Sequence, residues 1–168
     1  MSDGLKLTLK WDEESFMEGA KLAYDYEMKE SWRRYVGWFF IALTQFGVVG
    51  AVRYGAIGLL LVSTLLVTYW YFLRWPLRRS ALRRFFKKLP NAGREITLEV
   101  ESGGLCVDEV CVPWSSFRRV IASSKGYLLD MGDAFLYLPR EIFPDSESRN
   151  SFVAVLKEKI ENFRRFEK

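Results

Sequence analysis

The chain has 168 residues, of which 49% are hydrophobic, and a formal net charge of +4. The absence of histidine removes the usual general base and a common zinc ligand, and the two cysteines are too few for a disulfide scaffold. Residues 35–94 contain nine Lys or Arg residues and no acidic residue, whereas the segments on both sides are net acidic. This distribution argues against a nucleic-acid-binding domain, whose basic patch more often covers a folded surface.

The first predicted elements are a strand and a helix. LKLTLKW, residues 5–11, alternates apolar and polar side chains as a half-buried strand does. Ser15 and Glu18 have the spacing of a capping box, which predicts the start of a helix. The apolar face of this helix consists of Phe16, Ala20, Ala23, Tyr24 and Met28. Because a lone strand is not stable in water, we expect residues 5–11 to join a sheet formed by the C-terminal part of the chain.

The next segment predicts a membrane hairpin. From Tyr35 to Leu73 the only charged residue is Arg53. A single helix over this segment would be about 58 Å long, roughly twice the thickness of the hydrocarbon core. We therefore predict two membrane-spanning helices, residues 35–52 and 56–73, with RYG as the turn between them. A buried hairpin in a soluble protein is the alternative, but no other part of the chain is large enough to cover it.

Small residues recur every four positions at the end of the first span, at Gly47, Ala51 and Gly55. This spacing allows two helices to approach closely. We expect a seam between the two spans, and a homo-oligomer contact is the alternative.

The charges beside the spans predict their orientation. Arg33 and Arg34 precede the first span and the block RWPLRRSALRRFFKKLP, residues 74–90, follows the second. The positive-inside rule then places both termini in the cytoplasm, in a bacterial inner membrane. Aromatic residues at the same ends of the spans predict an interfacial belt. They are Trp32, Tyr35, Trp38, Tyr69, Trp70, Tyr71 and Trp75.

The basic block predicts an amphipathic helix over residues 77–89, beginning after a bend at Pro76. Its polar face carries Arg79, Arg83, Arg84, Lys87 and Lys88. Its apolar face carries Leu77, Ala81, Leu82, Phe85, Phe86 and Leu89, with Arg78 on the same side. We expect the basic face to lie at anionic lipid headgroups. The apolar face would lie at the membrane boundary or pack on the cytosolic domain.

PNAG, residues 90–93, separates this helix from a region of short strands. EITLEVESGG alternates as a strand, and LCVDEVCVPW predicts a hairpin in which Cys106 faces Cys111. A cross-strand disulfide fits this register, but a cytoplasmic location predicts free thiols. With no His and no further Cys nearby, we expect no metal site.

Three more strands and a helix complete the chain. SSFRRVIAS predicts a strand, and GYLLDMGDAFLYLP predicts a hairpin around Gly132 and Asp133. Asp145 is the expected N-cap of a terminal helix that covers the sheet. The apolar stripe of this helix consists of Phe152, Val155, Leu156, Ile160 and Phe163.

Two segments, VPWSSFRRV (112–120) and YLPREIFP (137–144), resemble the YcxB-like family of bacterial membrane proteins. The resemblance covers nearly the whole chain. It implies an α+β membrane protein in which a two-helix transmembrane hairpin is inserted in a cytosolic antiparallel pleckstrin-homology-like barrel with a C-terminal helix. The family has no established catalytic residues, so none is transferred. We expect Trp114 to be a packing residue rather than a ligand platform.

The predicted organisation is a strand and helix (1–31), a two-span hairpin (32–75), a basic juxtamembrane helix (76–90) and a β domain with its helix (91–168). The sequence contains no nucleotide-binding or nucleophile motif. We therefore predict no enzyme, no catalytic residue, no cofactor and no metal.

The leading hypothesis is a membrane-anchored interaction or regulatory protein whose cytosolic module binds a protein partner. An immunity protein that protects the cell from a membrane- or cell-wall-directed toxin is one alternative. A small oligomeric channel is another, disfavoured because neither span has a polar stripe. The expected partners are anionic lipid headgroups and a protein, not nucleic acid.

Overall fold

The N-terminal strand pairs with a strand from the second half of the chain, as predicted. In the computed structural model, which describes residues 5–90 and 92–166, β1 (Leu5–Lys10) lies antiparallel to β2 (Glu95–Val100). Two backbone bonds extend this pairing: Trp11 N–H donates to the Arg94 carbonyl (2.9 Å) and Gly93 N–H donates to the Trp11 carbonyl (2.8 Å). Leu7 and Leu9 are buried. The segment between β1 and β2 is therefore an insertion in a sheet.

The described chain divides into two compact units. The sheet unit contains residues 5–23 and 86–166, and the helical unit contains residues Tyr24–Phe85. The division falls inside helix α1 (Glu13–Glu30) and at the end of helix α4 (Arg74–Phe86). The sheet unit thus takes residues from both sides of the hairpin.

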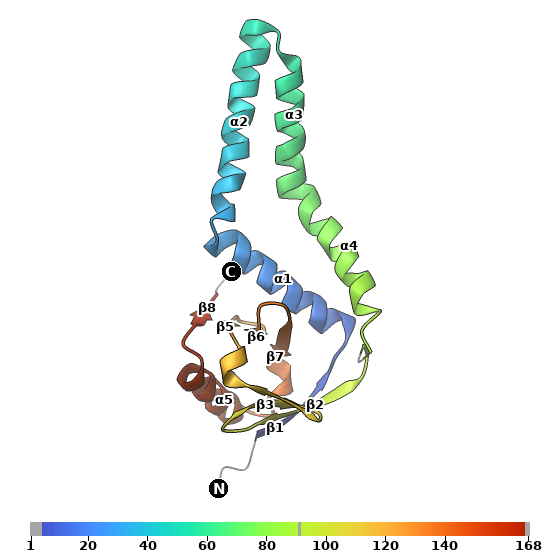
Figure 1. The fold of residues 1–168 in the computed structure, drawn as a ribbon, viewed down its shortest axis with the longest axis vertical. Coiled ribbons are helices and arrows are strands. Elements are labelled where there is room, and N and C mark those ends of the chain that lie inside the picture. The colour runs from blue at the N-terminus through green and yellow to red at the C-terminus, as the bar shows by residue number, and fades with distance from the viewer. Residues whose placement is uncertain (1–4, 91, 167–168) are drawn as a thin grey trace. The chain divides into compact units, whose positions relative to one another are not determined.

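The sheet unit contains two four-stranded sheets (Figure 1), with the orders β1-β2-β3-β4 and β7-β6-β5-β8. The remaining strands are β3 (Gly104–Val107), β4 (Val110–Pro113), β5 (Arg119–Ala122), β6 (Gly126–Asp130), β7 (Phe135–Pro139) and β8 (Phe163–Arg165). The hairpin between β6 and β7 is confirmed, with Met131 N–H bonded to the Ala134 carbonyl.

The predicted barrel does not close, because the strands form two sheets. Strand β5 pairs with β6 on one side and with β8 on the other, so it has no edge left for β4. Pro113, which has no N–H, ends β4, and the 3-10 turn Trp114–Ser116 carries the chain to the second sheet. Trp114 is buried at this corner and its indole N–H donates to the Glu101 carbonyl (3.1 Å), as a packing residue does.

The last helix is shorter than predicted. Helix α5 (Ser146–Lys159) begins at the expected N-cap, where the Asp145 carboxylate accepts the Ser148 N–H. Phe163, placed in the helical stripe by the sequence, belongs instead to β8, which runs parallel to β5. The bonds from Val120 N–H to the Asn162 carbonyl and from Phe166 N–H to the Ala122 carbonyl stabilise the extended conformation. Tertiary pairing thus overrides a spacing that fits a helix equally well.

Helix α1 begins differently from the prediction. Its first turn is capped by Asp12, whose carboxylate accepts the Ser15 N–H (2.8 Å), so Ser15 and Glu18 do not form a capping box. The sheet-unit part of α1 packs on β7 at Gly19, where a Cβ atom would lie 2.5 Å from the Cβ of Tyr137. Phe16 stacks on Phe135 with ring centroids 5.2 Å apart.

The helical unit contains α2 (Arg33–Tyr54), α3 (Ile57–Thr68), the π-helical turn Tyr69–Leu73 and α4. The chain stays helical from Ile57 to Phe86, so the basic helix starts at Arg74 and not after Pro76, and the helix changes direction between α3 and α4 (Figure 1). Proline lacks an N–H and crowds the carbonyl four residues earlier, which explains the local widening to a π turn just before it. The helix ends at Phe86 rather than at Leu89.

Candidate functional site

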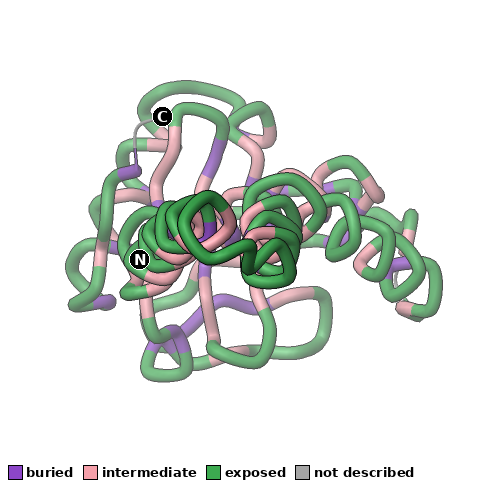
Figure 2. Tube along the Cα trace, turned by 90° about the horizontal axis from the view of Figure 1, so that it is seen from above, coloured by how far each residue is buried: buried purple, intermediate pink, exposed green. Residues whose placement is uncertain are grey.

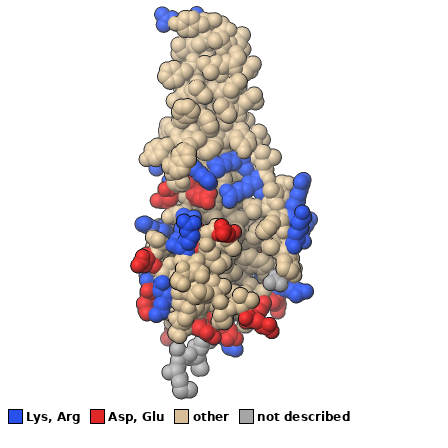
Figure 3. Space-filling view, viewed as in Figure 1, with Lys and Arg blue, Asp and Glu red and all other residues tan. Residues whose placement is uncertain are grey.

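The two hairpin helices expose their apolar side chains. Both are long and apolar enough to cross a membrane. Side chains far from either end are largely exposed, such as Phe46 (71%) and Leu65 (69%). Figure 2 draws these helices almost wholly in the exposed and intermediate colours, and Figure 3 shows charged atoms at the tip and at the opposite end but none along the column between them. In water such a surface is an interaction site.

The seam between α2 and α3 is centred on Gly47. A Cβ atom at this position would lie 2.9 Å from Ser63 Oγ and 3.1 Å from the Leu60 Cα. Ser63 is fully buried, and its hydroxyl donates to the Leu60 carbonyl (3.0 Å). A glycine facing a serine therefore lets the two backbones approach closely.

The other members of the small-residue pattern differ from Gly47. Ala51 is half-buried, and Gly55 lies outside both helices. Gly55 is the left-handed C-cap of α2 (φ 67°), and a Cβ there would meet nothing within 4 Å. Gly55 is thus a turn residue, not a packing residue. Sequence reasoning missed Gly37, where a Cβ would lie 2.6 Å from the Tyr71 hydroxyl.

Arginine side chains join the end of α1 to the other helices of the helical unit. The Arg74 guanidinium lies 4.3 Å from the centroid of the Trp70 ring and 5.6 Å from that of Tyr24. Glu27 pairs with Arg33 (2.7 Å) and lies 3.8 Å from Arg78. Arg78, which the helical wheel places on the apolar side, is therefore held by an acidic partner from α1.

The five residues of the predicted basic face are all exposed. Arg79, Arg83 and Arg84 lie on α4, whereas Lys87 and Lys88 lie in the turn that follows it. The apolar face divides into two parts. Phe86 is buried with its ring 5.2 Å from Phe16, but Leu77 and Phe85 remain more than half exposed. An exposed apolar stripe therefore runs along the same helix as the basic residues.

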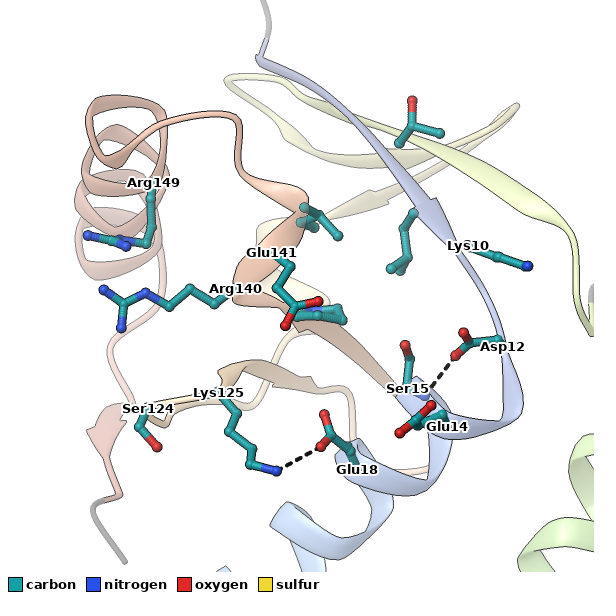
Figure 4. Close-up of a pocket in the computed structure, with 14 residues that line it drawn as sticks. Lys10, Asp12, Glu14, Ser15, Glu18, Ser124, Lys125, Arg140, Glu141 and Arg149 are labelled. Carbon is teal, nitrogen blue, oxygen red and sulfur yellow. Dashed lines mark hydrogen bonds and ion pairs between the residues drawn. The ribbon is translucent and has the colours of Figure 1, made fainter.

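The sheet unit contains a polar groove of about 800 Å³. It lies between β1, the start of α1, the β5–β6 turn, the 3-10 turn Arg140–Ile142 and α5 (Figure 4). Its charged lining consists of Lys10, Lys125, Arg140 and Arg149 with Asp12, Glu14, Glu18 and Glu141. Positive and negative groups are thus balanced along the walls.

Glu18 organises the middle of this groove. Its carboxylate accepts a bond from Lys125 Nζ (2.9 Å) and lies 3.4 Å from the Tyr137 hydroxyl. Burial, together with the charge of Glu18, raises the pKa of the Tyr137 phenol. The bond to Glu18 and its charge raise the pKa of the Lys125 ammonium. Tyr137 therefore stays protonated and Lys125 stays charged at neutral pH.

The predicted free thiols are wrong, because Cys106 and Cys111 form a disulfide. The register places them directly opposite each other on β3 and β4, with Cα atoms 3.9 Å apart. The Glu101 carboxylate lies within 4.8 Å of both sulfur atoms, but the disulfide leaves neither as a thiolate ligand.

Comparison with protein-family models, curated proteins and solved structures gives no significant match to any of them. The resemblance to the YcxB-like family therefore rests on the sequence segments alone.

The seam predicts a difference between two glycines of the hairpin. Gly47→Ala should destabilise the helical unit by about 1–3 kcal/mol, because the new methyl group meets the Leu60 backbone. Gly58→Ala is the matched control, since its Cβ would meet nothing within 4 Å. Unfolding of the full chain by SDS in mixed micelles measures both. Equal effects of the two substitutions would contradict a seam at Gly47.

Proposed function

We propose that this chain is a non-catalytic, membrane-anchored interaction protein of the bacterial inner membrane. The observation that carries the proposal is the exposed apolar surface of the hairpin. Burying it in hydrocarbon would recover roughly 25 cal/mol per Å² of apolar area. The seam at Gly47 supports the same assignment, because helices in lipid associate through close packing.

The charges support an orientation with both termini in the cytoplasm. Arg33, Arg34 and the basic residues of α4 lie at one end of the spans, and Arg53 lies alone at the other. The disulfide between Cys106 and Cys111 stands against this orientation, because the cytoplasm keeps protein thiols reduced.

The sheet unit is the proposed recognition module, and its polar groove is the proposed contact surface for a protein partner. The balanced charges along the groove suit a polypeptide with side chains of both signs. Lys125 and Glu18 at its centre already pair with each other. A partner would gain specificity by matching the charged groups around that pair.

The basic residues of α4 predict a preference for anionic membranes. A peptide of residues 74–90 should bind vesicles that contain phosphatidylglycerol much more tightly than vesicles of phosphatidylcholine alone. Each basic residue near the surface contributes about 1 kcal/mol. Replacing Arg79, Arg83, Arg84, Lys87 and Lys88 with Gln should abolish most of the difference.

Vesicle flotation of both peptides provides the measurement. Equal binding of the unmodified peptide to the two kinds of vesicle would contradict the membrane-surface role. Tighter binding to an oligonucleotide at physiological salt would favour nucleic acid instead.

The groove predicts where a partner contacts the sheet unit. A photocrosslinking amino acid in place of Glu141, which lines the groove, should give a discrete crosslinked product in cells. The same substitution at Glu161, which is exposed and does not line the groove, is the control. Charge reversal of Lys125 should remove the product at Glu141. Identical products at both positions, or none at Glu141, would argue against this contact surface.

A further inference from the structure

A second pocket of about 460 Å³ opens next to the polar groove in the sheet unit. Three arginines from three different elements line it: Arg140 from the 3-10 turn, Arg149 from α5 and Arg165 from β8. Arg140, Arg149 and Ser124 line both the groove and this pocket. Figure 4 shows Arg140 and Arg149 extending toward the same side, away from Glu141.

Among the residues that the structure describes, these guanidinium groups have no anionic partner. Within the described part of the chain, none of the three takes part in an ion pair or a side-chain hydrogen bond. The described residues that line this pocket include no Asp or Glu, in contrast to the balanced groove beside it. The charged part of the described lining of this pocket is therefore purely cationic, with three arginines from three elements.

Converging cations repel each other, so an anion that reached all three would relieve this repulsion. A guanidinium presents a planar fork of N–H donors that matches the oxygens of a phosphate group. Ser124 adds a hydroxyl, whereas the hydroxyl of Ser123 is already bonded to the Gly126 carbonyl. A dianionic phosphate monoester is better matched to three arginines than a monoanionic diester.

The other side chains that line the pocket indicate which chemical group of the ligand would lie next to its phosphate. Tyr127, Val153 and Phe163 supply aromatic and aliphatic surface. Lys157 Nζ lies 5.5 Å from the centroid of the Phe163 ring. An apolar or aromatic group next to the phosphate could therefore pack on these side chains.

We propose that this pocket, defined by Ser124, Arg140, Arg149 and Arg165, binds a phosphate monoester that carries an apolar group. The site goes beyond the proposed protein-binding role, because it requires neither a partner protein nor a membrane-spanning hairpin. The phosphate could belong to a free metabolite or to a lipid headgroup, and the two sources share the same chemistry.

Saturation-transfer NMR with phenyl phosphate tests the site, using the full chain in phosphatidylcholine nanodiscs at physiological salt. We expect saturable binding that Arg149→Gln or Arg165→Gln weakens about tenfold or more, since each removes a charge-assisted hydrogen-bond donor. Arg164→Gln is the matched control. It lies beside Arg165 on β8, does not line the pocket, and should change the affinity less than about twofold.

Nanodiscs with phosphatidic acid, a monoester, and with phosphatidylglycerol, a diester, identify the source. If a lipid headgroup is the ligand, phosphatidic acid alone should block phenyl phosphate. If a free metabolite is the ligand, neither lipid should compete. Absence of saturable binding would overturn the proposal. So would equal weakening by Arg164→Gln and Arg165→Gln, which would indicate general attraction to positive charge. Each outcome is independent of the crosslinking at Glu141.

Discussion

The pairing of β1 with β2 is the constraint on which the rest of this structure depends. Residues 11–94 lie between the two strands, and closing a loop of that length costs roughly 4 kcal/mol of chain entropy. Burial of Leu7 and Leu9 contributes about 1.5–3 kcal/mol each, which offsets that cost. The bonds between Trp11 and the residues 93 and 94 hold the two chain segments together where they leave the sheet. The helical hairpin is thus tied at both of its ends to one sheet unit.

The helical unit is held together by close packing, ring contacts and charged contacts, none of which depends on the hydrophobic effect. Small residues meet at Gly47 and Ser63, and Phe40 packs edge-on against Trp70 with centroids 5.5 Å apart. At the end that carries most of the charge, Arg74 lies over the Trp70 ring, and Arg78 lies over the Tyr24 ring and near Glu27. The basic residues of α4 therefore have different roles: some fix the helices to one another, and others, such as Arg79 and Arg84, remain exposed to a surrounding surface.

Local patterns in the sequence predicted most elements and the pairing of β1 with the C-terminal sheet, but not the strand order or the partners of β5. Alternation identified β1, and the Asp145 cap identified the start of α5, because both are determined by neighbouring residues. The register of the β3–β4 hairpin was also predictable, although the oxidation state of Cys106 and Cys111 was inferred from a location and not from geometry. Phe163 fits a helix as well as a strand, and only the free edge of β5 decides between them. That same edge explains why the sheets do not close into a barrel. The pocket at Arg149 and Arg165 could not be predicted, because it joins residues from elements that the sequence does not place together.

Collisional accessibility of nitroxide labels tests the central claim most directly, namely that the hairpin tied to the sheet unit lies in a bilayer. The measurement uses full-length chains in liposomes, each with one label at an exposed apolar position. Two labels lie in the apolar helices, at Phe46 and Leu65, one lies at the turn, at Tyr54, and one lies on the sheet unit, at Val110. The account predicts high accessibility to oxygen and low accessibility to a water-soluble nickel chelate at Phe46 and Leu65, with the reverse at Tyr54 and Val110. Ready access of the nickel chelate to Phe46 and Leu65, equal to that at Val110, would contradict it.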